Sequence, residues 1–310
     1  MKVLITPRSF GKNDSSPVEL LKKHGIEIVE NSTDGIMNEA QMKDAIASCD
    51  GIIIGVDPLN ADVISAAPKL RAVAKYGVGV DNIDLKACAA RGIPVSRTIG
   101  ANSAAVADYA FGLMLAAARE IILIDRACRN GDWGKITTQD VSGKTLGLVG
   151  LGAIGRQMVQ RAKGFGMKIM AYDIFWDEEY AAAEGIVKSD VDSICRECDF
   201  ISLHLPLTDE TRHLIGEGQI ALMKPSAFII NTARGGIIDE DALLTALKNK
   251  RIAGAGLDVF EQEPPTNRDW FLLDNIVIGS HCAAATIDAA DSMSRMAAHN
   301  LLVDLGLINQ

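Results

Sequence analysis

Short apolar runs alternate with longer stretches of helical pattern along most of the chain. Over the first 98 residues, the apolar runs have the length of strands and the segments between them have the spacing of helices. Such alternation predicts a parallel sheet flanked by helices. The expected strands are Val3–Thr6, Ile26–Val29, Gly51–Ile54, Ala72–Lys75 and Ile93–Ser96.

The same alternation continues in the second half of the chain. Helical patterns such as Asp239–Lys248 separate further apolar runs, which predicts a second doubly wound parallel sheet and makes the protein α/β. The expected strands of this sheet are Leu146–Val149, Met167–Tyr172, Phe200–Leu203, Ala227–Asn231, Gly254–Asp258 and Ile276–Ile278.

Two longer helical patterns indicate the domain organisation. Residues 101–119 are nearly all apolar after an N-cap at Asn102 or Ser103, so this helix must be buried, as a connection packed between domains would be. Residues 286–305 form one amphipathic pattern that can return to the first sheet. The expected domains are therefore residues 1–99 with 285–310, and residues 100–284.

A glycine fingerprint joins the first two strands of the second sheet. Gly150 permits the tight turn out of the strand, Gly152 lets the backbone approach a pyrophosphate, and Gly155 lets the following helix pack closely. Unpaired N–H groups at the helix N-terminus favour the same diphosphate. Asp173 ends the next strand, where a carboxylate can bind both hydroxyls of an adenosine ribose. A purely structural glycine turn is the alternative.

The residues after Asp173 distinguish between the two nicotinamide dinucleotides. They are Ile174, Phe175 and Trp176, so no arginine follows to receive a 2′-phosphate. The carboxylate of Asp173 would itself repel such a phosphate. We therefore predict NAD rather than NADP.

Composition fits a two-domain globular protein and narrows its partners. The 310 residues are 48% hydrophobic and 23% charged, and the formal net charge of −9 argues against nucleic acid or an anionic membrane as a partner. No apolar stretch reaches the roughly 18–20 residues that span a bilayer. Because the chain enters its first strand without a signal segment, we expect a cytoplasmic protein.

The six cysteines show no disulfide framework. Cys195 and Cys198 have the spacing of a redox or zinc pair. Neither a second such pair nor a nearby pair of histidines completes a tetrahedral site. Ordinary packing is the favoured interpretation, and no metal site is predicted.

Three ionisable residues follow three successive strands of the second sheet. Arg234, Glu263 and His281 each lie just beyond the carboxyl end of a strand, the edge at which open α/β sheets bind ligands. The set suits oxidation of an alcohol beside a carboxylate. Arginine offers a planar fork to oxygen atoms, histidine exchanges the hydroxyl proton near neutral pH, and a carboxylate orients the histidine. Taken singly, the three could instead be a surface charge, a solvated turn residue and a loop histidine.

The first domain contains a candidate anion-binding site. Gly77-Val78-Gly79 follows the fourth expected strand and precedes Asp81-Asn82. Glycines at the carboxyl end of a strand expose backbone N–H groups, which suit a carboxylate. A plain turn is the alternative.

Together these motifs resemble those of the D-isomer-specific 2-hydroxyacid dehydrogenases, above all the branch that contains 3-phosphoglycerate dehydrogenases and glyoxylate/hydroxypyruvate reductases. The match runs in order over nearly the whole chain. The segments that carry it are Tyr76–Asp84, Asn102-Ser103, Gly150–Gly155, His204–Pro206, Asn231–Gly236, Leu257–Pro264 and His281.

The resemblance implies a flavodoxin-like substrate domain, a Rossmann NAD-binding domain, a homodimer built around residues 100–140, and hydride transfer between the nicotinamide and C2 of an (R)-2-hydroxy acid. Arg234 would bind the substrate, His281 would be the acid/base and Glu263 its partner. Further substrate contacts would come from Lys75, Val78, Gly79 and Asn102. Further NAD contacts would come from Ala153, Ile154, Leu205, Pro206, Thr232, Ala233, Asp258 and Ala284, with Arg234 and His281 at the nicotinamide.

Departures from the family pattern leave the substrate open. Phosphoglycerate dehydrogenases often carry two phosphate-binding arginines where this chain has Lys75 and Gly55, and neither residue offers a bidentate fork. Cys282-Ala-Ala-Ala285 replaces the usual small residues after His281, and the Arg8–Gly11 loop has no assigned role. The alternatives are phosphoglycerate oxidation, reduction of glyoxylate or hydroxypyruvate, and a non-catalytic NAD-sensing interaction protein. A formate or phosphite enzyme is disfavoured.

Overall fold

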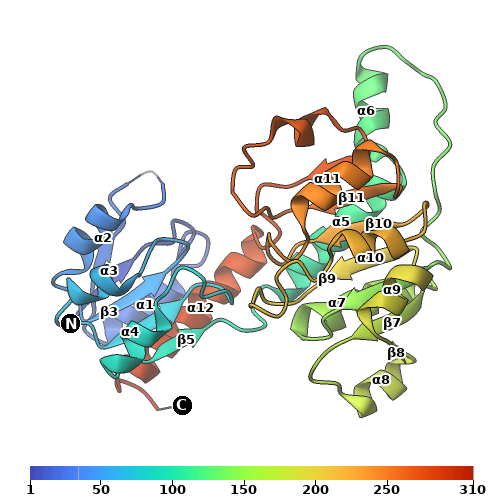
Figure 1. The fold of residues 1–310 in the computed structure, drawn as a ribbon. Coiled ribbons are helices and arrows are strands. Elements are labelled where there is room, and N and C mark those ends of the chain that lie inside the picture. The colour runs from blue at the N-terminus through green and yellow to red at the C-terminus, as the bar shows by residue number, and fades with distance from the viewer. Residues whose placement is uncertain (34, 310) are drawn as a thin grey trace. The chain divides into compact units, whose positions relative to one another are not determined.

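The computed structural model describes residues 1–33 and 35–309. The chain divides into two compact units (Figure 1), of which unit 1 is Met1–Asn102 with Ala285–Gln310 and unit 2 is Ser103–Ala284. The chain enters unit 2 after Asn102 rather than after residue 99, because the first helix of that unit begins at Ser103.

Unit 1 is built on a five-stranded parallel sheet with the order β2-β1-β3-β4-β5. The order reverses beside β1, which is the flavodoxin-like arrangement. Every strand lies within two residues of its expected position. The strands are β1 Lys2–Ile5, β2 Glu27–Glu30, β3 Gly51–Ile54, β4 Ala72–Lys75 and β5 Val95–Arg97.

Polar caps begin three of the helices that connect these strands. Asn38, Asn60 and Asp84 each accept a hydrogen bond from a backbone N–H in the first turn of the following helix. Each cap satisfies a donor that has no partner within the helix, so the helix begins there. The helices are α1 Ser16–Lys23, α2 Glu39–Ile46, α3 Ala61–Ser65 and α4 Leu85–Ala90.

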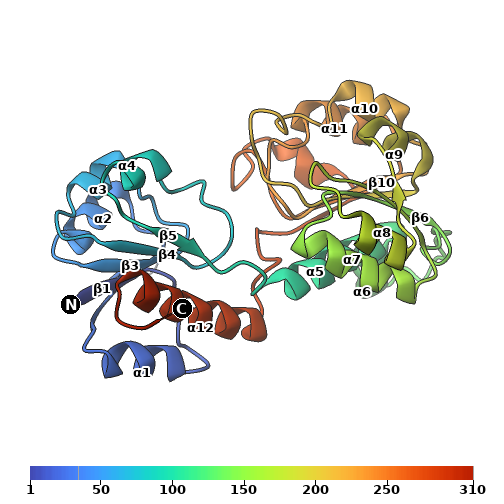
Figure 2. The ribbon, with the colours of Figure 1, turned by 90° about the horizontal axis from the view of Figure 1, so that it is seen from below.

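The C-terminal helix α12, Ile287–Asp304, completes unit 1. It packs against α1, β3, β4 and β5, and Figure 2 shows it beside α1 on one face of the sheet. Its apolar side chains, among them Ala297 and Leu301, share a buried core with Val3 and Ile53. The amphipathic pattern of residues 286–305 therefore buries its apolar face against the N-terminal sheet, as predicted.

Unit 2 is built on a seven-stranded parallel sheet with the order β12-β11-β10-β9-β6-β7-β8. The strand order reverses between β6 and β9, and open α/β sheets bind ligands at such a switch point. The six expected strands all form, each within one residue of its predicted bounds. The strands are β6 Thr145–Val149, β7 Lys168–Tyr172, β8 Val187–Lys188, β9 Phe200–Leu203, β10 Phe228–Asn231, β11 Gly254–Leu257 and β12 Ile276–Ile278.

Helices cover both faces of this sheet (Figure 2). On one face, α5 (Ser103–Ala118) and α7 (Ala153–Gly164) share a core with Leu148 and Ile230. The opposite face carries a second core under three further helices. These are α9 Val191–Glu197, α10 Glu217–Leu222 and α11 Glu240–Lys248, while α8 Glu178–Glu184 and the 3₁₀ helix Arg268–Leu272 lie in connections. The apolar helix predicted at 101–119 is α5, and α7, β10 and β11 account for its burial.

Two elements were not predicted. β8 is an edge strand of two residues, too short to give an apolar run. Helix α6, Ile121–Arg129, has no buried residue and stands out from unit 2 with the long loop that follows it (Figure 1). We call residues 120–140, which comprise α6 and this loop, the arm.

All six cysteines are free. Cys195 and Cys198 are buried in the core of unit 2, and this burial raises the pKa of both thiols to about 12. Both are therefore protonated packing residues, as expected, rather than a reactive pair. Within residues 1–33 and 35–309, no helix has the length and apolar character needed to cross a membrane. The same residues contain no cluster of three potential metal ligands.

Candidate active site

The glycine fingerprint forms the turn between β6 and α7. Gly150 has a φ of 106°, and a Cβ at this position would lie 2.5 Å from the carbonyl oxygen of His204. A Cβ at Gly155 would lie 2.2 Å from the carbonyl oxygen of Gly150, whereas one at Gly152 would meet only open space. The first and third glycines are thus required by the packing of the turn, and the second leaves room for a ligand.

The N-terminus of α7 meets the requirements of a diphosphate. No side chain caps it, and its first turn contains no acidic residue. The backbone N–H groups of Gly152, Ala153 and Ile154 have no acceptor among the described residues. These donors and the positive end of the helix dipole suit an anion, which agrees with the contacts expected of Ala153 and Ile154.

Asp173 stands at the end of β7, beside this turn. Its carboxylate accepts a hydrogen bond from the N–H of Leu151 at 2.6 Å and another from Phe175 at 2.8 Å. The carboxylate is thereby fixed next to the fingerprint, and its oxygen atoms have further lone pairs for ribose hydroxyls.

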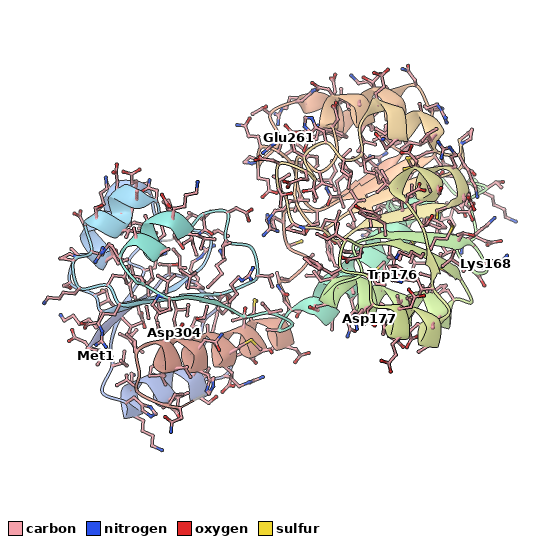
Figure 3. All side chains as sticks on the ribbon, turned by 60° about the horizontal axis from the view of Figure 1, so that its bottom comes forward. Met1, Lys168, Trp176, Asp177, Glu261 and Asp304 are labelled. Atoms are coloured by element: carbon pink, nitrogen blue, oxygen red, sulfur yellow. The ribbon has the colours of Figure 1, made fainter. Side chains whose placement is uncertain are left out.

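One cation near Asp173 was not foreseen from the sequence. Arg156, in the first turns of α7, pairs with Asp177 at 2.7 Å, and its guanidinium lies 4.2 Å from the ring centre of Tyr180. Asp177 is labelled in Figure 3 on the segment after β7. Because Arg156 already has a carboxylate and an aromatic partner, it is poorly placed to receive a 2′-phosphate. The local charges thus agree with NAD.

Two buried polar atoms at strand exits have no hydrogen-bond partner among the described residues, Thr232 Oγ1 and His204 Nδ1. Thr232 belongs to the pair expected beneath the nicotinamide, so its unpaired hydroxyl fits a polar ligand group there. His204 bonds through Nε2 to Ser202 at 2.9 Å, and desolvation lowers the pKa of its imidazole to about 3. His204 is therefore neutral at physiological pH. Of the two residues expected at the adenine, Leu205 lies beside Gly150 and Pro206 is exposed.

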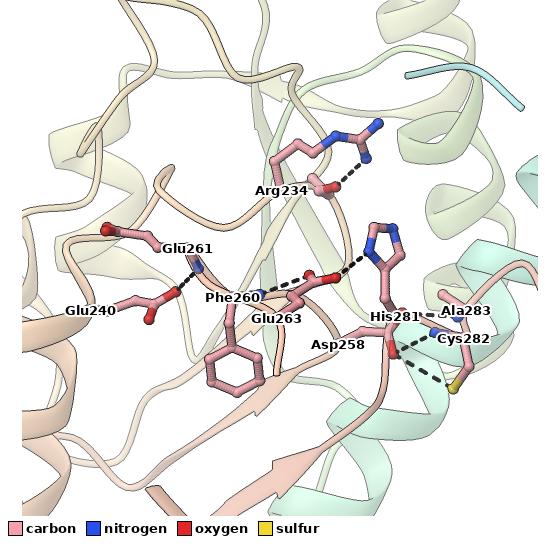
Figure 4. A network of polar contacts seen from close by, with 10 residues as sticks. Arg234, Glu240, Asp258, Phe260, Glu261, Glu263, His281, Cys282 and Ala283 are labelled. Carbon is pink, nitrogen blue, oxygen red and sulfur yellow. Dashed lines mark hydrogen bonds and ion pairs between the residues drawn. The ribbon is translucent and has the colours of Figure 1, made fainter. Parts of the chain in front are cut away.

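The three ionisable residues follow the carboxyl ends of three adjacent strands. β10, β11 and β12 are parallel neighbours, so Arg234, Glu263 and His281 lie beyond the same edge of the sheet. Figure 4 shows these side chains gathered at this edge, with the imidazole of His281 on the side on which Arg234 lies. The sheet order therefore brings together residues that are far apart in the sequence.

His281 and Glu263 form a hydrogen-bonded pair. His281 Nδ1 lies 2.8 Å from Glu263 Oε2, and Glu263 Oε1 accepts a hydrogen bond from the N–H of Phe260 at 3.1 Å. The carboxylate therefore joins its own loop to the imidazole and leaves His281 Nε2 as the ring nitrogen that can exchange a proton. The side chain of His281 is 47% exposed, which leaves that nitrogen open to a substrate.

Asp258 holds the His281 loop in shape. Its carboxylate is buried and accepts hydrogen bonds from the N–H groups of Cys282 at 3.0 Å and Ala283 at 2.8 Å, while its carbonyl accepts from the N–H of His281 at 2.8 Å. The thiol of Cys282 donates to the hydroxyl of Tyr109 at 3.2 Å. Asp258, which is expected to bind the nicotinamide carboxamide, orients the loop that carries the imidazole. Ala284 directly follows the three residues whose N–H groups Asp258 binds.

Arg234 sits on a turn that Asn231 stabilises. The Asn231 side chain accepts from the N–H of Ala233 at 3.0 Å and donates to the carbonyl of Arg234 at 2.8 Å. A Cβ on Gly235 would lie 2.0 Å from the carbonyl carbon of Phe260. Only a glycine lets the loop after β11 pass this close to the turn after β10, so Gly235 sets the spacing between the Arg234 turn and the loop of Glu263.

The four remaining expected substrate residues lie in unit 1. The N–H groups of Val78 and Gly79 have no acceptor among the described residues, and Asn102 Oδ1 has no hydrogen-bond partner there either. These groups fit polar ligand contacts. Lys75 differs, because its side chain is only 5% exposed and its ammonium donates to the carbonyl of Gly55 at 2.5 Å and to Asn82 Oδ1 at 2.8 Å.

Two residues of the loop after β1 contact Tyr76 within unit 1. Ser9 Oγ lies 3.0 Å from the hydroxyl of Tyr76, and the ring of Phe10 packs edge-on against Tyr76. The Tyr76 hydroxyl donates to the carbonyl of Ala290 at the start of α12. These contacts fix the loop to the carboxyl end of β4 and to the C-terminal helix.

Four residues that contact the loops of the candidate site were not predicted from the sequence, namely Asn231, Gly235, Tyr109 and Glu240. Asn231 and Gly235 lie inside a recognised motif, so their position at a strand exit was a usable signal. Tyr109 and Glu240 lie in helices and gave no such signal, because their relevance depends on contacts with residues far along the chain.

Comparison with known proteins agrees with this geometry. Residues 111–283 match the family model of the NAD-binding domain of the D-isomer specific 2-hydroxyacid dehydrogenases. The match lies within unit 2 and contains the fingerprint, Asp173, Arg234, Glu263 and His281.

Individual proteins of several activities are similar to the chain. A glyoxylate reductase from Korarchaeum cryptofilum is 45% identical over 265 residues, which cover 83% of this chain and 80% of that protein. A D-3-phosphoglycerate dehydrogenase from Methanocaldococcus jannaschii is 45% identical over 246 residues, which cover 78% of this chain and 47% of that protein. The solved structure of D-lactate dehydrogenase from Aquifex aeolicus, complexed with NAD and lactic acid, has a TM-score of 0.84 at 28% identity and covers 99% of this chain and 97% of its own.

Proposed function

Since this chain belongs to the D-isomer specific 2-hydroxyacid dehydrogenase family and is an NAD-dependent oxidoreductase of that class, we propose that it reduces a short 2-oxo acid without a phosphate group, such as glyoxylate or hydroxypyruvate. The observation that carries this choice of substrate is the burial of Lys75. A phosphate group needs a cation that can reach it, and the ammonium of Lys75 is held inside unit 1 by Gly55 and Asn82.

The proposed chemistry assigns one task to each residue of the set. Bound NAD supplies the acceptor or donor of hydride. His281 removes the hydroxyl proton in oxidation and supplies it to the carbonyl oxygen in reduction, through Nε2, because Nδ1 is occupied by Glu263. Arg234 binds the substrate carboxylate and polarises the carbonyl oxygen. Glu263 orients the imidazole and stabilises its protonated form.

The remaining contacts are proposed from the matching motifs and from unpaired polar groups. We assign the cofactor diphosphate to Gly152, Ala153 and Ile154, its ribose to Asp173, and its nicotinamide end to Thr232, Ala233, Asp258 and Ala284. Leu205 and Pro206 would border the adenine. In unit 1, the N–H groups of Val78 and Gly79 would bind the substrate carboxylate, and Asn102 would assist them.

A side-by-side substrate panel tests this proposal. NADH oxidation is measured with glyoxylate, hydroxypyruvate, pyruvate and 3-phosphohydroxypyruvate at matched concentrations. We expect kcat/KM for glyoxylate or hydroxypyruvate to exceed that for 3-phosphohydroxypyruvate by roughly tenfold or more, since an unpaired phosphate loses at least one charge-assisted hydrogen bond. A preference for the phosphorylated acid would contradict the choice of substrate but not the class of reaction.

We also propose that the protein acts as a cytoplasmic homodimer joined through the arm. The arm exposes apolar side chains that nothing else in its own unit covers, with Trp133 82% exposed and Ile122 59% exposed. Apolar groups gathered on one projecting segment favour burial against a second copy of the same surface. The free thiols are compatible with a reducing compartment.

A further inference from the structure

Glu240 lies behind the proposed catalytic pair and is used by none of the steps above. It stands in the first turn of α11, where Asp239 is the N-cap. Its side chain is half-buried, and Glu240 Oε1 accepts a hydrogen bond from the N–H of Glu261 at 2.5 Å. Figure 4 shows this contact beside the loop that carries Glu263.

Two carboxylates hold neighbouring N–H groups of that loop. Glu240 accepts a hydrogen bond from the N–H of Glu261, and Glu263 Oε1 accepts one from the N–H of Phe260 at 3.1 Å. The other oxygen of Glu263 bonds to His281 Nδ1 at 2.8 Å. The backbone of Phe260 and Glu261 therefore links the hydrogen bond of Glu240 to the hydrogen bonds of Glu263, one of which reaches the imidazole.

The loop has little freedom on its opposite side. Its Phe260–Glu261 peptide passes so close to Gly235 that any side chain there would collide with it. Glu240 and Gly235 thus constrain the same peptide, and both act before Glu263 reaches the imidazole. Without Glu240, one of these constraints and the acceptor of the Glu261 N–H are lost.

We propose that Glu240 is a positioning residue of the reaction, which fixes the loop of Glu263 and so keeps the imidazole of His281 in its working orientation. The inference rests on the roles proposed above for Glu263 and His281. It adds that the negative charge of Glu240 strengthens the basicity of His281, because this charge lies near Glu263 and favours the protonated imidazole.

The burial of Glu240 and the charges around it make the ionisation of its carboxyl depend on pH in the neutral range. Burial raises the pKa of Glu240 to about 7, and the negative charges of Glu261, Asp241 and Glu263 add to the effect, while the N–H of Glu261 opposes it. Across the loop, Glu261 pairs with His213 at 2.9 Å. The carboxyl of Glu240 therefore changes its charge near neutral pH.

The test compares Glu240→Gln and Glu240→Ala in the full-length protein, with Asp241→Asn as the matched control. Asp241 is also acidic and lies in the same helical turn, but it is exposed and does not supply the acceptor for the Glu261 N–H. For each variant, kcat and KM for glyoxylate are measured across pH 5 to 9, together with NADH affinity by fluorescence titration and the thermal unfolding midpoint.

We expect E240A to lower kcat by roughly 10- to 100-fold, the scale at which outer groups tune the residues they orient, with NADH affinity unchanged. E240Q retains an acceptor for the Glu261 N–H, so its kcat at the optimum should stay within about threefold of wild type. Because E240Q lacks the charge, its pH profile should shift toward acid by roughly half a unit. D241N should match wild type in kcat.

Thermal stability checks the protonation state independently. The folded-state pKa of Glu240 is raised from 4.5, so its favourable contribution is complete below pH 4.5 and is lost as pH rises toward 7. The unfolding midpoint of E240Q should therefore rise relative to wild type as pH increases over that interval.

Two results would overturn the inference. One is that E240A and E240Q both reproduce the wild-type kcat and pH profile. The other is that both lose kcat, NADH affinity and thermal stability in parallel, which would mark a purely structural residue. If E240A does not fold, the pH profile of E240Q decides. A failure of the proposed function is recognised separately, because the substrate panel would then favour the phosphorylated acid, or because His281 variants would retain turnover.

Discussion

His281 has a φ of 57°, a left-handed conformation that few residues other than glycine adopt readily. Asp258 accounts for it, since its carboxylate and carbonyl bind three consecutive N–H groups of the loop, those of His281, Cys282 and Ala283. A conformation that the surroundings impose in this way is a sign of a functional residue rather than of a free loop.

The role of His281 is best tested by His281→Asn, because asparagine tolerates the left-handed conformation. We expect kcat to fall by roughly 10²- to 10⁴-fold, the usual contribution of a general acid or base, while NADH still binds. Steady-state turnover and an NADH fluorescence titration measure the two properties. His299→Asn, an exposed histidine on α12, is the control and should match wild type. Turnover close to normal in H281N would remove His281 from the mechanism.

At the scale of elements, the unit β6–α7–β7 carries the residues that we propose bind the diphosphate and ribose of the cofactor. The space beside Gly152 in the fingerprint turn is open. Asp173, at the end of β7, accepts a hydrogen bond from the N–H of Leu151 in the same turn. Strand, turn, helix and second strand are consecutive in the chain, so local geometry alone can build this half of the site.

Replacing Asp173 separates its two tasks. Asp173→Ala should weaken NADH binding by roughly tenfold or more and reduce the discrimination against NADPH, because both the ribose acceptor and the repelling charge are lost. Asp173→Asn keeps an acceptor for the Leu151 N–H, so it should reduce the discrimination with a smaller loss of NADH affinity. Calorimetric titration with both cofactors measures these effects. Unchanged affinity and preference in D173A would show that the ribose lies elsewhere.

At the scale of the whole molecule, the chain folds as two units, each with its own parallel sheet and core, and crosses between them twice. Helix α6 of the arm has no buried residue within unit 2. In the homodimer that we propose, the exposed isoleucines and Trp133 of the arm would be buried against the second copy.

The oligomeric state in solution tests the proposal that the arm is a dimer interface. Light scattering after gel filtration should give wild-type protein about twice the chain mass of 33.1 kDa. The double variant Ile122→Glu, Trp133→Ala should elute as a monomer, because a charge and a truncation remove the apolar contact. Leu272→Ser, at another exposed apolar position of unit 2, is the control and should remain dimeric. A monomeric wild type would exclude the arm as an interface.

The strands, the glycine fingerprint and the NAD cofactor could be predicted from the amino-acid sequence, because each depends on residues that are neighbours in the chain. Apolar runs located every strand of both sheets except the two-residue β8. The order of strand, glycine turn and terminal acid was sufficient to predict NAD at Asp173. Helix α6 was not predicted although its sequence is amphipathic, and its apolar side is not buried within unit 2.

Contacts between residues far apart in the sequence became known only from the folded arrangement. The hydrogen bond between Glu263 and His281, the clamp of Asp258 and the contact of Glu240 with Glu261 all join segments that different strands or helices carry. The burial of Lys75 could not be read from its position in a motif either, because it depends on Gly55 and Asn82 from two other segments. Sequence spacing specifies local geometry, whereas the order of strands in a sheet specifies which side chains meet at its edge.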